Sequence, residues 1–277
     1  MITGTACVRR RSRAVSVLAT AGLCALVPAT APRSSAVHAG ASSRAVPAAK
    51  SGTPFAGTAA VGALFTRANG KLGRHFCTAS VVHSPHGDLL ITAAHCMTGK
   101  QLTPAGSIEF APGYHAGQFP HGIWLVTGMF VDSRWSSRQD PNDDVAFLVA
   151  GRSGRQIEKH TGAEHLAVNR KPPEMVQVIG YPDGKDQPIK CTAPARAYDP
   201  GKLRQLIFAC DDYTDGTSGG PFLLAIDRKT GDGLVVGVIG GYQEGGDSPD
   251  ISYSPRFLRN VRALYKVAVS NQPASGA

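Results

Sequence analysis

The sequence has few charged residues and few aromatic ones. Asp, Glu, Lys and Arg make up 18% of the 277 residues and aromatic residues 7%, whereas hydrophobic residues reach 42%. Disordered chains combine low hydrophobicity with high net charge, so this composition excludes that class and predicts a globular protein. The length suffices for one large all-β domain or two small domains.

The sequence lacks an apolar run long enough to cross a membrane as a stable helix. The stretch 14–27 is short and rich in alanine, whereas a spanning helix needs about 20 apolar residues. Four arginines precede it between residues 9 and 13, and a small-x-small pattern follows at 37–39. This order is typical of a secretory signal peptide, which we predict over 1–39. A disordered N-terminus or a retained anchor is the alternative.

No stripe of Lys and Arg interleaved with aromatic residues follows the predicted signal peptide. The formal net charge is +9, but residues 1–39 hold five Arg and no acidic residue, so their removal leaves +4. The sequence therefore shows no strong pattern of basic residues that would indicate nucleic-acid binding. We expect a secreted, extracellular monomer. We expect no nucleic-acid partner and no membrane contact once the signal is removed.

No two cysteines have the C-x-x-C spacing that is common in zinc sites. Two of the six cysteines fall within the predicted signal peptide, and four remain. An even number in an exported chain indicates disulfides. Three pairings are possible from the sequence, and local pairing would close two loops of similar length. The four residues are Cys77, Cys96, Cys191 and Cys210.

One short histidine pattern suggests a metal site, the H-x-x-H pair of His83 and His86. Pro85 lies between them and the segment has no helical pattern, so a solvated turn is the better interpretation. We therefore expect neither a metal nor another cofactor.

Helical periodicity is absent from most of the chain. Residues 40–56 are rich in Ala, Ser, Gly and Pro, which indicates a short propeptide or flexible leader. Further on, short apolar runs bounded by turn residues favour strands. One apolar stripe with spacings of three and four predicts a helix over 256–268. The predicted strands are 61–66, 79–83, 88–93, 123–131, 145–149, 176–180, 206–210, 221–226 and 234–239.

Three short segments carry residue types suited to nucleophilic catalysis: 91–96 (ITAAHC), 143–148 (DDVAFL) and 215–221 (DGTSGGP). A serine hydroxyl needs a base, and imidazole suits because it titrates near neutral pH. A carboxylate fixes the tautomer of that imidazole. Glycines beside the serine permit a turn that presents backbone N–H groups to a developing oxyanion. Each segment alone is a weak signal, but the three together in the order His, Asp, Ser are much more specific.

These segments resemble the three motifs of the trypsin/chymotrypsin family of serine proteases. Residues 92–96 are similar to its histidine motif, 144–148 to its aspartate motif and 216–221 to its serine motif. The similarity runs from about residue 58 to 268. Segments 178–182 and 210–218 look closer to the bacterial branch that includes glutamyl endopeptidases.

The resemblance implies an all-β, chymotrypsin-like fold with a C-terminal α-helix. The protease domain would span 57–277, with two perpendicular six-stranded barrels at about 57–160 and 165–255 and the active site between them. The composition changes near residues 151–172, and this segment could join the two halves. The resemblance also implies that Cys77 pairs with Cys96 across the histidine loop.

The same resemblance implies a serine endopeptidase that acts on a peptide or protein substrate through an acyl-enzyme, and it implies a role for each catalytic residue. Ser218 would be the nucleophile, His95 the general base and then acid, and Asp144 the orienting carboxylate. Asp143 is an alternative to Asp144, which directly precedes the apolar run. The N–H groups of Gly216 and Ser218 would form the oxyanion hole.

Substrate recognition is expected at two places. The strand near Gly240 and Gly241 would pair with the substrate backbone. Asp212 precedes Ser218 by six residues, where trypsin carries its pocket aspartate, and would favour Lys or Arg in the substrate. A surface position for this aspartate is the alternative. Ile239 stands where glutamyl endopeptidases place a histidine, so Glu specificity is not indicated.

Chain order excludes another hydrolase fold. Residues 216–220 also match the G-x-S-x-G elbow of α/β-hydrolases, in which the histidine follows the serine. All nine histidines of this chain precede Ser218, so that fold is excluded. A catalytically silent, protease-like binding protein is the remaining alternative, although no residue of the triad is lost.

Overall fold

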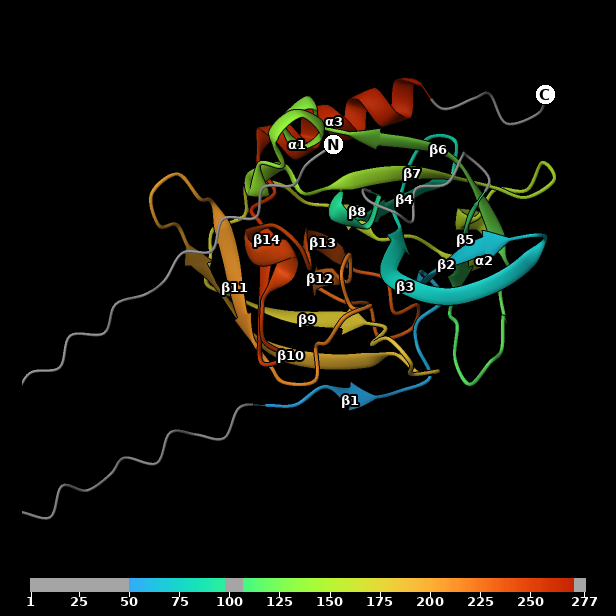
Figure 1. Cartoon of the computed structure of the whole chain (residues 1–277), viewed down its shortest axis with the longest axis horizontal. Helices are drawn as coiled ribbons and strands as arrows, with labels where there is room; N and C mark the ends of the chain where they lie inside the picture. Colours follow the sequence, from blue (N-terminus) through green and yellow to red (C-terminus); the bar gives the residue numbers. More distant parts are fainter. Residues whose placement is uncertain (1–49, 98–106, 272–277) are drawn as a thin grey trace, which may run out of the picture. The chain divides into compact units, whose positions relative to one another are not determined.

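The computed structural model describes residues 50–97 and 107–271. The predicted signal peptide and most of the predicted leader lie outside these residues. Strands form two sheets, and a helix lies near the C-terminus (Figure 1). None of the described helices is long and apolar enough to cross a membrane. The fold is therefore mostly β, as the sequence predicts.

The first half of the described chain is a closed six-stranded barrel with the strand order β2-β3-β4-β7-β6-β5. All neighbouring pairs are antiparallel. Side chains alternate across each strand, so one set, which includes Leu64, Phe110 and Leu148, fills the first hydrophobic core. The strands are β2 (Val61–Ala68), β3 (Lys71–Val81), β4 (Leu89–Thr92), β5 (Ile108–Pro112), β6 (Trp124–Val131) and β7 (Ala146–Gly151).

The second half is an eight-stranded sheet with the order β14-β11-β10-β9-β12-β13-β8, and β1 pairs with β10. The resemblance implies six strands in this half. The structure has two more, β1 and β8, each of two residues. The strands are β1 (Thr53–Pro54), β8 (His165–Leu166), β9 (Glu174–Gly180), β10 (Ile189–Tyr198), β11 (Gln205–Ala209), β12 (Pro221–Leu224), β13 (Leu234–Val238) and β14 (Ile251–Pro255).

The end of the segment predicted as a flexible leader is part of this sheet. Thr53 and Pro54 pair with Ile189 and Lys190 of β10. The Gly52 N–H donates to the carbonyl oxygen of Asp211 at 2.9 Å. Backbone hydrogen bonds therefore hold residues from 52 onward against the second sheet, which composition alone does not reveal.

A second hydrophobic core joins the two halves. It combines first-barrel side chains such as Ile91 and Phe147 with second-sheet side chains such as Ile179 and Val238. The C-terminal helix α3 (Arg259–Ser270) adds its apolar stripe to this core. Successive side chains of a strand point to opposite faces, so β4 and β7 contribute side chains to both cores. This packing on both faces holds the ends of the two strands in place.

Helix α3 spans Arg259–Ser270 rather than the predicted 256–268 because Leu258 is still extended. Val261, Leu264 and Ala268 are its buried residues, at the expected spacings of three and four. The other helical segments are α1 (Ser133–Arg138), α2 (Glu158–Thr161) and the 3₁₀ turns η1 (His95–Met97), η2 (Pro141–Asp143) and η3 (Tyr242–Gly245).

Each half contains one disulfide. Cys77 of β3 pairs with Cys96 of η1, and Cys191 of β10 pairs with Cys210 directly after β11. Both bonds join residues 19 positions apart. The local pairing is thus the one that the structure contains.

Candidate active site

The pairing of two barrel strands brings His95 and Asp144 together. In the antiparallel register of β4 and β7, Thr92 lies opposite Ala146. His95 follows the end of β4 and Asp144 precedes the start of β7, so both lie at the same end of the barrel. All four residues of β4 are buried, which anchors this end.

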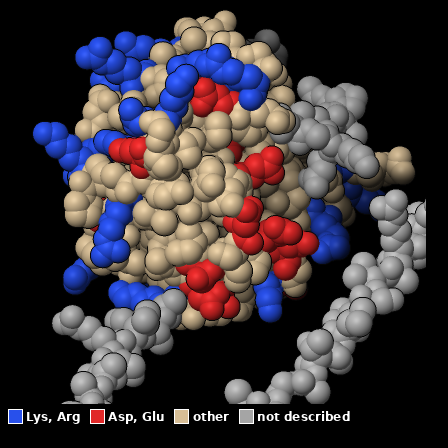
Figure 2. Space-filling model, turned by 60° about the vertical axis from the view of Figure 1, so that its left-hand side comes forward, with Lys and Arg blue, Asp and Glu red and all other residues tan. Residues whose placement is uncertain are grey.

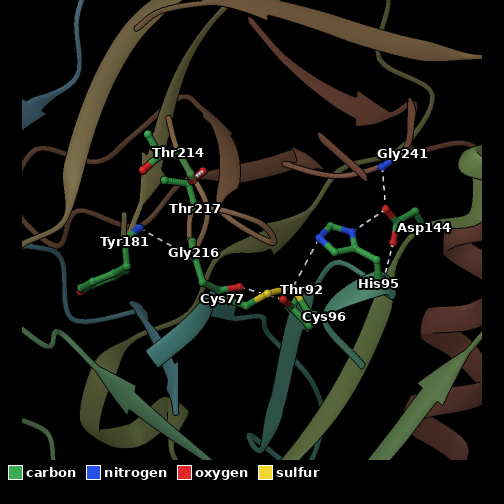
Figure 3. The surroundings of a disulfide bond; sticks show 11 residues. Cys77, Thr92, His95, Cys96, Asp144, Tyr181, Thr214, Gly216, Thr217 and Gly241 are labelled. Atoms are coloured by element: carbon green, nitrogen blue, oxygen red, sulfur yellow. Dashed lines mark hydrogen bonds and ion pairs between the residues drawn. A yellow bond between two sulfur atoms is a disulfide. The ribbon is translucent and has the colours of Figure 1, made fainter. Parts of the chain in front are cut away.

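Asp144 contacts His95 at two points, the imidazole and the backbone N–H (Figure 3). Its Oδ2 lies 2.8 Å from Nδ1 of His95, and its Oδ1 accepts from the His95 backbone N–H at 2.8 Å. The Gly241 N–H also donates to Oδ2, at 2.7 Å. Because a carboxylate only accepts, Nδ1 carries the proton in this pair, which leaves Nε2 with a lone pair to act as a base.

The surroundings of His95 stabilise its protonated form. Burial disfavours the charged imidazolium, but the charge and hydrogen bond of Asp144, together with the charge of Glu244, outweigh burial and raise the pKa of His95. Asp144 is fully buried, so its charge is poorly screened by water. The imidazolium that forms when His95 accepts a proton is therefore stabilised.

Asp143, the alternative carboxylate, points to other partners. Its Oδ1 lies 2.9 Å from a guanidinium nitrogen of Arg134 and accepts from the side-chain amide of Asn260 at 2.8 Å. These contacts tie η2 to α1 and α3. The structure therefore brings Asp144, and not Asp143, to His95.

Two hydrogen bonds from Thr78 hold the Ser218 loop against the first barrel. The Thr78 N–H donates to the Ser218 carbonyl oxygen at 2.7 Å, and the Thr78 hydroxyl donates to the Gly216 carbonyl oxygen at 3.0 Å. Gly216 and Gly219 have φ values of +88° and +80°, which side chains rarely adopt. A Cβ at Gly219 would also collide with the Thr92 hydroxyl and the Thr78 carbonyl. Both glycines are required for this turn.

Ser218 and His95 line the same open cavity of about 620 Å³. Other lining residues come from the segment 213–217, from Ile239 and from the segment 243–249. A reacting group in the cavity would therefore meet both a hydroxyl and an imidazole.

Asp212 lies away from this cavity. It is exposed, has a φ of +75°, and lines a different cavity together with Pro54 and Lys185. Gly240 and Gly241 instead lie beside Asp144: a Cβ at Gly240 would be 2.9 Å from Oδ2. The structure thus brings Gly240 and Gly241 to the site and leaves Asp212 on another surface.

The sequence model of the trypsin family matches residues 53–262, which is most of the chain. The chain belongs to the trypsin family. Membership makes it a serine-type peptidase, and its mostly β fold agrees with those of bacterial chymotrypsin-like proteases. None of the curated proteins that were compared with the chain matches it.

Three solved structures of proteases share this fold. The protease Anisep from Arthrobacter nicotinovorans superposes with a TM-score of 0.65 at 20% identity, over 79% of this chain and 100% of its own. The thermostable serine protease AL20 from an extremophilic microorganism gives 0.64 at 25% identity, over 78% and 99%. A Glu endopeptidase in complex with MPD gives 0.62 at 17% identity, over 80% and 98%. The first and third likenesses establish the fold alone.

One group of side chains in the described residues has the spacing of a metal site, namely Cys77, His95 and Cys96. Both sulfur atoms are joined in the disulfide, so neither is a thiolate that could bind a metal. Cys96 Sγ lies 3.8 Å from Nε2 of His95, so the disulfide packs against the base. Its role in this trypsin-family site is structural.

Sequence reasoning missed two residues that shape the site. Thr78 fixes the Ser218 loop through its backbone and its hydroxyl, but a threonine within a strand gives no sequence signal. Glu244 lines the cavity and acts on His95 by its charge. Its place between the glycine pairs of GGYQEGG, at 240–246, is the only signal that could have indicated it.

Proposed function

We propose that the protein is a secreted serine endopeptidase that hydrolyses peptide bonds through an acyl-enzyme, with Ser218, His95 and Asp144 as its triad. The observation that carries the proposal is the buried Asp144–His95 pair, which faces the cavity that Ser218 also lines. Family membership supports the class of reaction.

In the proposed first step, the Ser218 hydroxyl oxygen attacks the carbonyl carbon of the scissile bond. Nε2 of His95 takes the hydroxyl proton, and Asp144 stabilises the resulting imidazolium. The tetrahedral intermediate then expels the amine, which receives that proton from His95. Water repeats the sequence on the acyl-enzyme and releases the carboxylic acid together with free Ser218.

The backbone N–H groups of Gly216 and Ser218 are the proposed oxyanion hole. Among the described residues, neither group donates to a protein acceptor, whereas the neighbouring Gly219 N–H donates to the Ile239 carbonyl. The left-handed φ of Gly216 belongs to the turn that presents these groups. Their availability supports a role in binding the charged oxygen of the intermediate.

Export is supported by the cysteines. Two disulfides occur within the described residues, and disulfides persist mainly in oxidising compartments. The predicted signal peptide over 1–39 lies outside the described residues, as does the predicted cleavage point. Secretion, the monomeric state and a peptide or protein substrate are parts of this proposal.

Digestion of a mixed peptide library tests the proposal. The protein is expressed under oxidising conditions as wild type, as Ser218→Ala, and as Ser136→Ala, which changes an exposed serine of α1. We expect equal cleavage by wild type and Ser136→Ala and none by Ser218→Ala. No cleavage by a folded wild type with both disulfides formed would overturn the proposal and favour a protease-like binding protein.

A further inference from the structure

Four arginines line a cavity of about 470 Å³ to which both halves of the molecule contribute. Arg134 comes from α1 of the first half, and Arg204, Arg256 and Arg259 come from the second half. Two aspartates line the same cavity, so its charged side chains carry a net charge of +2. Figure 2 shows that charge is unevenly distributed: on the visible face most basic side chains lie in the upper and left parts, and most acidic ones lie lower and to the right.

Both aspartates of the cavity already have partners. Oδ1 of Asp143 lies 2.9 Å from a guanidinium nitrogen of Arg134 and accepts from the side-chain amide of Asn260 at 2.8 Å. Asp140 caps η2 and pairs with Arg138 at 3.2 Å. Within the described residues, neither aspartate pairs with any of the other three arginines of the cavity.

Those three arginines keep donors that no protein group accepts. Nε of Arg256 is buried without a hydrogen-bond partner, although the same guanidinium pairs with Asp199 at 2.9 Å. Within 50–97 and 107–271 the exposed side chain of Arg259 forms no ion pair or hydrogen bond, and that of Arg204 donates to backbone carbonyls within three residues of it. Because a buried donor without an acceptor is costly, an acceptor from outside the protein would stabilise this arrangement.

The start of α3 adds backbone donors to the same cavity. Leu258, the N-cap residue, forms no side-chain cap hydrogen bond, and the first turn of α3 contains no acidic residue. In the part of the chain that the structure describes, the N–H groups of residues 259–261 donate to no acceptor. Free N–H groups and the helix dipole at a helix N-terminus favour an anion. The arginines and the helix start therefore favour the same kind of ligand.

We propose that this cavity binds a tetrahedral oxyanion, a phosphate or sulfate group, through Arg204, Arg256 and Arg259 together with the start of α3. Such a group presents several acceptor oxygens, and a guanidinium can bind two of them at once. The cavity is far larger than one such ion, so it has room for a larger molecule that carries the group. It shares no lining residue with the cavity beside Ser218, and the inference therefore does not depend on the proposed function.

Calorimetric titration of the folded protein with inorganic phosphate, and separately with inorganic sulfate, tests the inference. We expect one ion per chain with a dissociation constant of about 1 mM or lower. At ten times that concentration the melting temperature should rise by about 4 °C. Arg204→Gln and Arg259→Gln should each weaken binding about tenfold, the order for one hydrogen bond to a charged group. Both side chains are exposed, so each variant should keep the wild-type melting temperature without anion.

Arg262→Gln is the matched control, because Arg262 is exposed on the same helix and does not line the cavity. We expect wild-type affinity in this variant. Raising the concentration of sodium chloride should weaken binding in the wild type and the control alike.

A sulfated polysaccharide, compared with the same polysaccharide without sulfate, distinguishes the two sources of the anion. Tighter binding of the sulfated chain than of free sulfate, weakened by Arg204→Gln, would assign the cavity to a group on a larger molecule. Binding of the free ions alone would assign it to a small anion.

Three results would overturn the inference. The first is the absence of saturable binding of either ion at about 10 mM. The second is equal affinity in wild type, Arg204→Gln and Arg259→Gln. The third is a loss of binding in Arg155→Gln alone, which would place the ion in the cavity that Arg152 and Arg155 line. There Arg152 already lies over the Trp124 ring, 5.7 Å from its centroid.

Discussion

The two halves of the molecule contribute different kinds of residue to the site. The closed first barrel supplies His95 and Asp144, which are buried or nearly so and hydrogen-bonded to one another. The second sheet supplies the Ser218 loop and the cavity, with left-handed glycines and exposed carboxylates. The proposed base and its carboxylate therefore lie in a buried part of the fold, whereas most of the residues that line the cavity lie in turns of the second half.

The largest loss of activity is expected from a substitution in the first barrel. Asp144→Asn keeps the shape of the side chain but replaces one of its two acceptor oxygens by an NH₂ group, which donates, so the three N–H groups that Asp144 binds are left with one acceptor oxygen instead of two. We expect kcat/KM to fall about ten-thousandfold for every peptide that the wild type cleaves, because the carboxylate no longer fixes the tautomer of the imidazole.

Asp143→Asn is the control for that change. Asp143 contacts Arg134 and Asn260, so its variant should retain most of the activity. A larger loss in Asp143→Asn than in Asp144→Asn would contradict the assignment of the orienting carboxylate.

The second prediction compares two left-handed glycines. Gly219→Ala places a Cβ against Thr92 and Thr78, which would displace the Ser218 loop and lower activity at least a hundredfold. Gly117 has a similar φ of +73° but open space around it. Gly117→Ala should lower the free energy of unfolding by roughly 1–2 kcal/mol and leave activity unchanged. Equal activity in both variants would show that the Ser218 turn tolerates displacement.

The third prediction concerns the two disulfides. Both close loops of the same length, so replacing either pair by alanine should lower the free energy of unfolding by similar amounts, about 3 kcal/mol. The kinetic effects should differ. Loss of Cys77–Cys96, which packs against His95, should lower kcat for every peptide. Loss of Cys191–Cys210, which anchors the segment just before the lining residues 213–218, should raise KM. Identical changes of kcat and KM in the two variants would contradict the different roles that we assign to the two halves.

The fourth prediction concerns Glu164, which links the two halves. Its N–H donates to the Val81 carbonyl of the first barrel, and its carboxylate accepts from the Gly233 N–H of the second half. One carboxylate oxygen, Oε1, is buried without a partner. Burial, reinforced by the charge of Asp232, raises the pKa of Glu164 to about 8 despite that hydrogen bond.

The raised pKa of Glu164 fixes the sign of the pH effect. The folded protein binds the Glu164 proton more tightly than the unfolded chain, so stability falls as pH rises from the ordinary value near 4.5 to about 8. Glu164→Gln removes the ionisation and should flatten this decline, which urea unfolding from pH 5 to pH 9 would measure. An unchanged decline in the variant would show that another group causes it.

Much of the fold is encoded locally. Nine predicted runs overlap β2, β3, β4, β6, β7, β9, β11, β12 and β13. Two of the missed strands, β10 and β14, carry mainly small or polar residues at their buried positions. In β10 the inward residues include Cys191, Ala193 and Ala195, and in β14 they include Ser252 and Ser254. Ser254 is tolerated there because its hydroxyl accepts from the Val238 N–H and donates to the Pro255 carbonyl, a partnership that only the folded sheet creates.

The site divides in the same way. His95, Asp144 and Ser218 stand in short motifs whose chemistry is legible from neighbouring residues. The position of Asp212 depends on the path of an irregular loop, in which the Thr214 N–H bonds back to the Asp212 carbonyl at 3.0 Å. The exposure of Glu244 depends on a left-handed turn that no propensity predicts. The candidate catalytic residues could therefore be named from the sequence, and the residues that line the cavity could not.

Covalent labelling of the nucleophile tests the central claim most directly. The folded protein is incubated with an aryl phosphonate that reacts with activated serines, and the adduct is located by peptide mass spectrometry. The account predicts a single adduct on Ser218 in wild type, and almost none in Asp144→Asn, in which the base is misoriented. An adduct on another serine, or equal labelling of Ser218 in Asp144→Asn, would contradict the account.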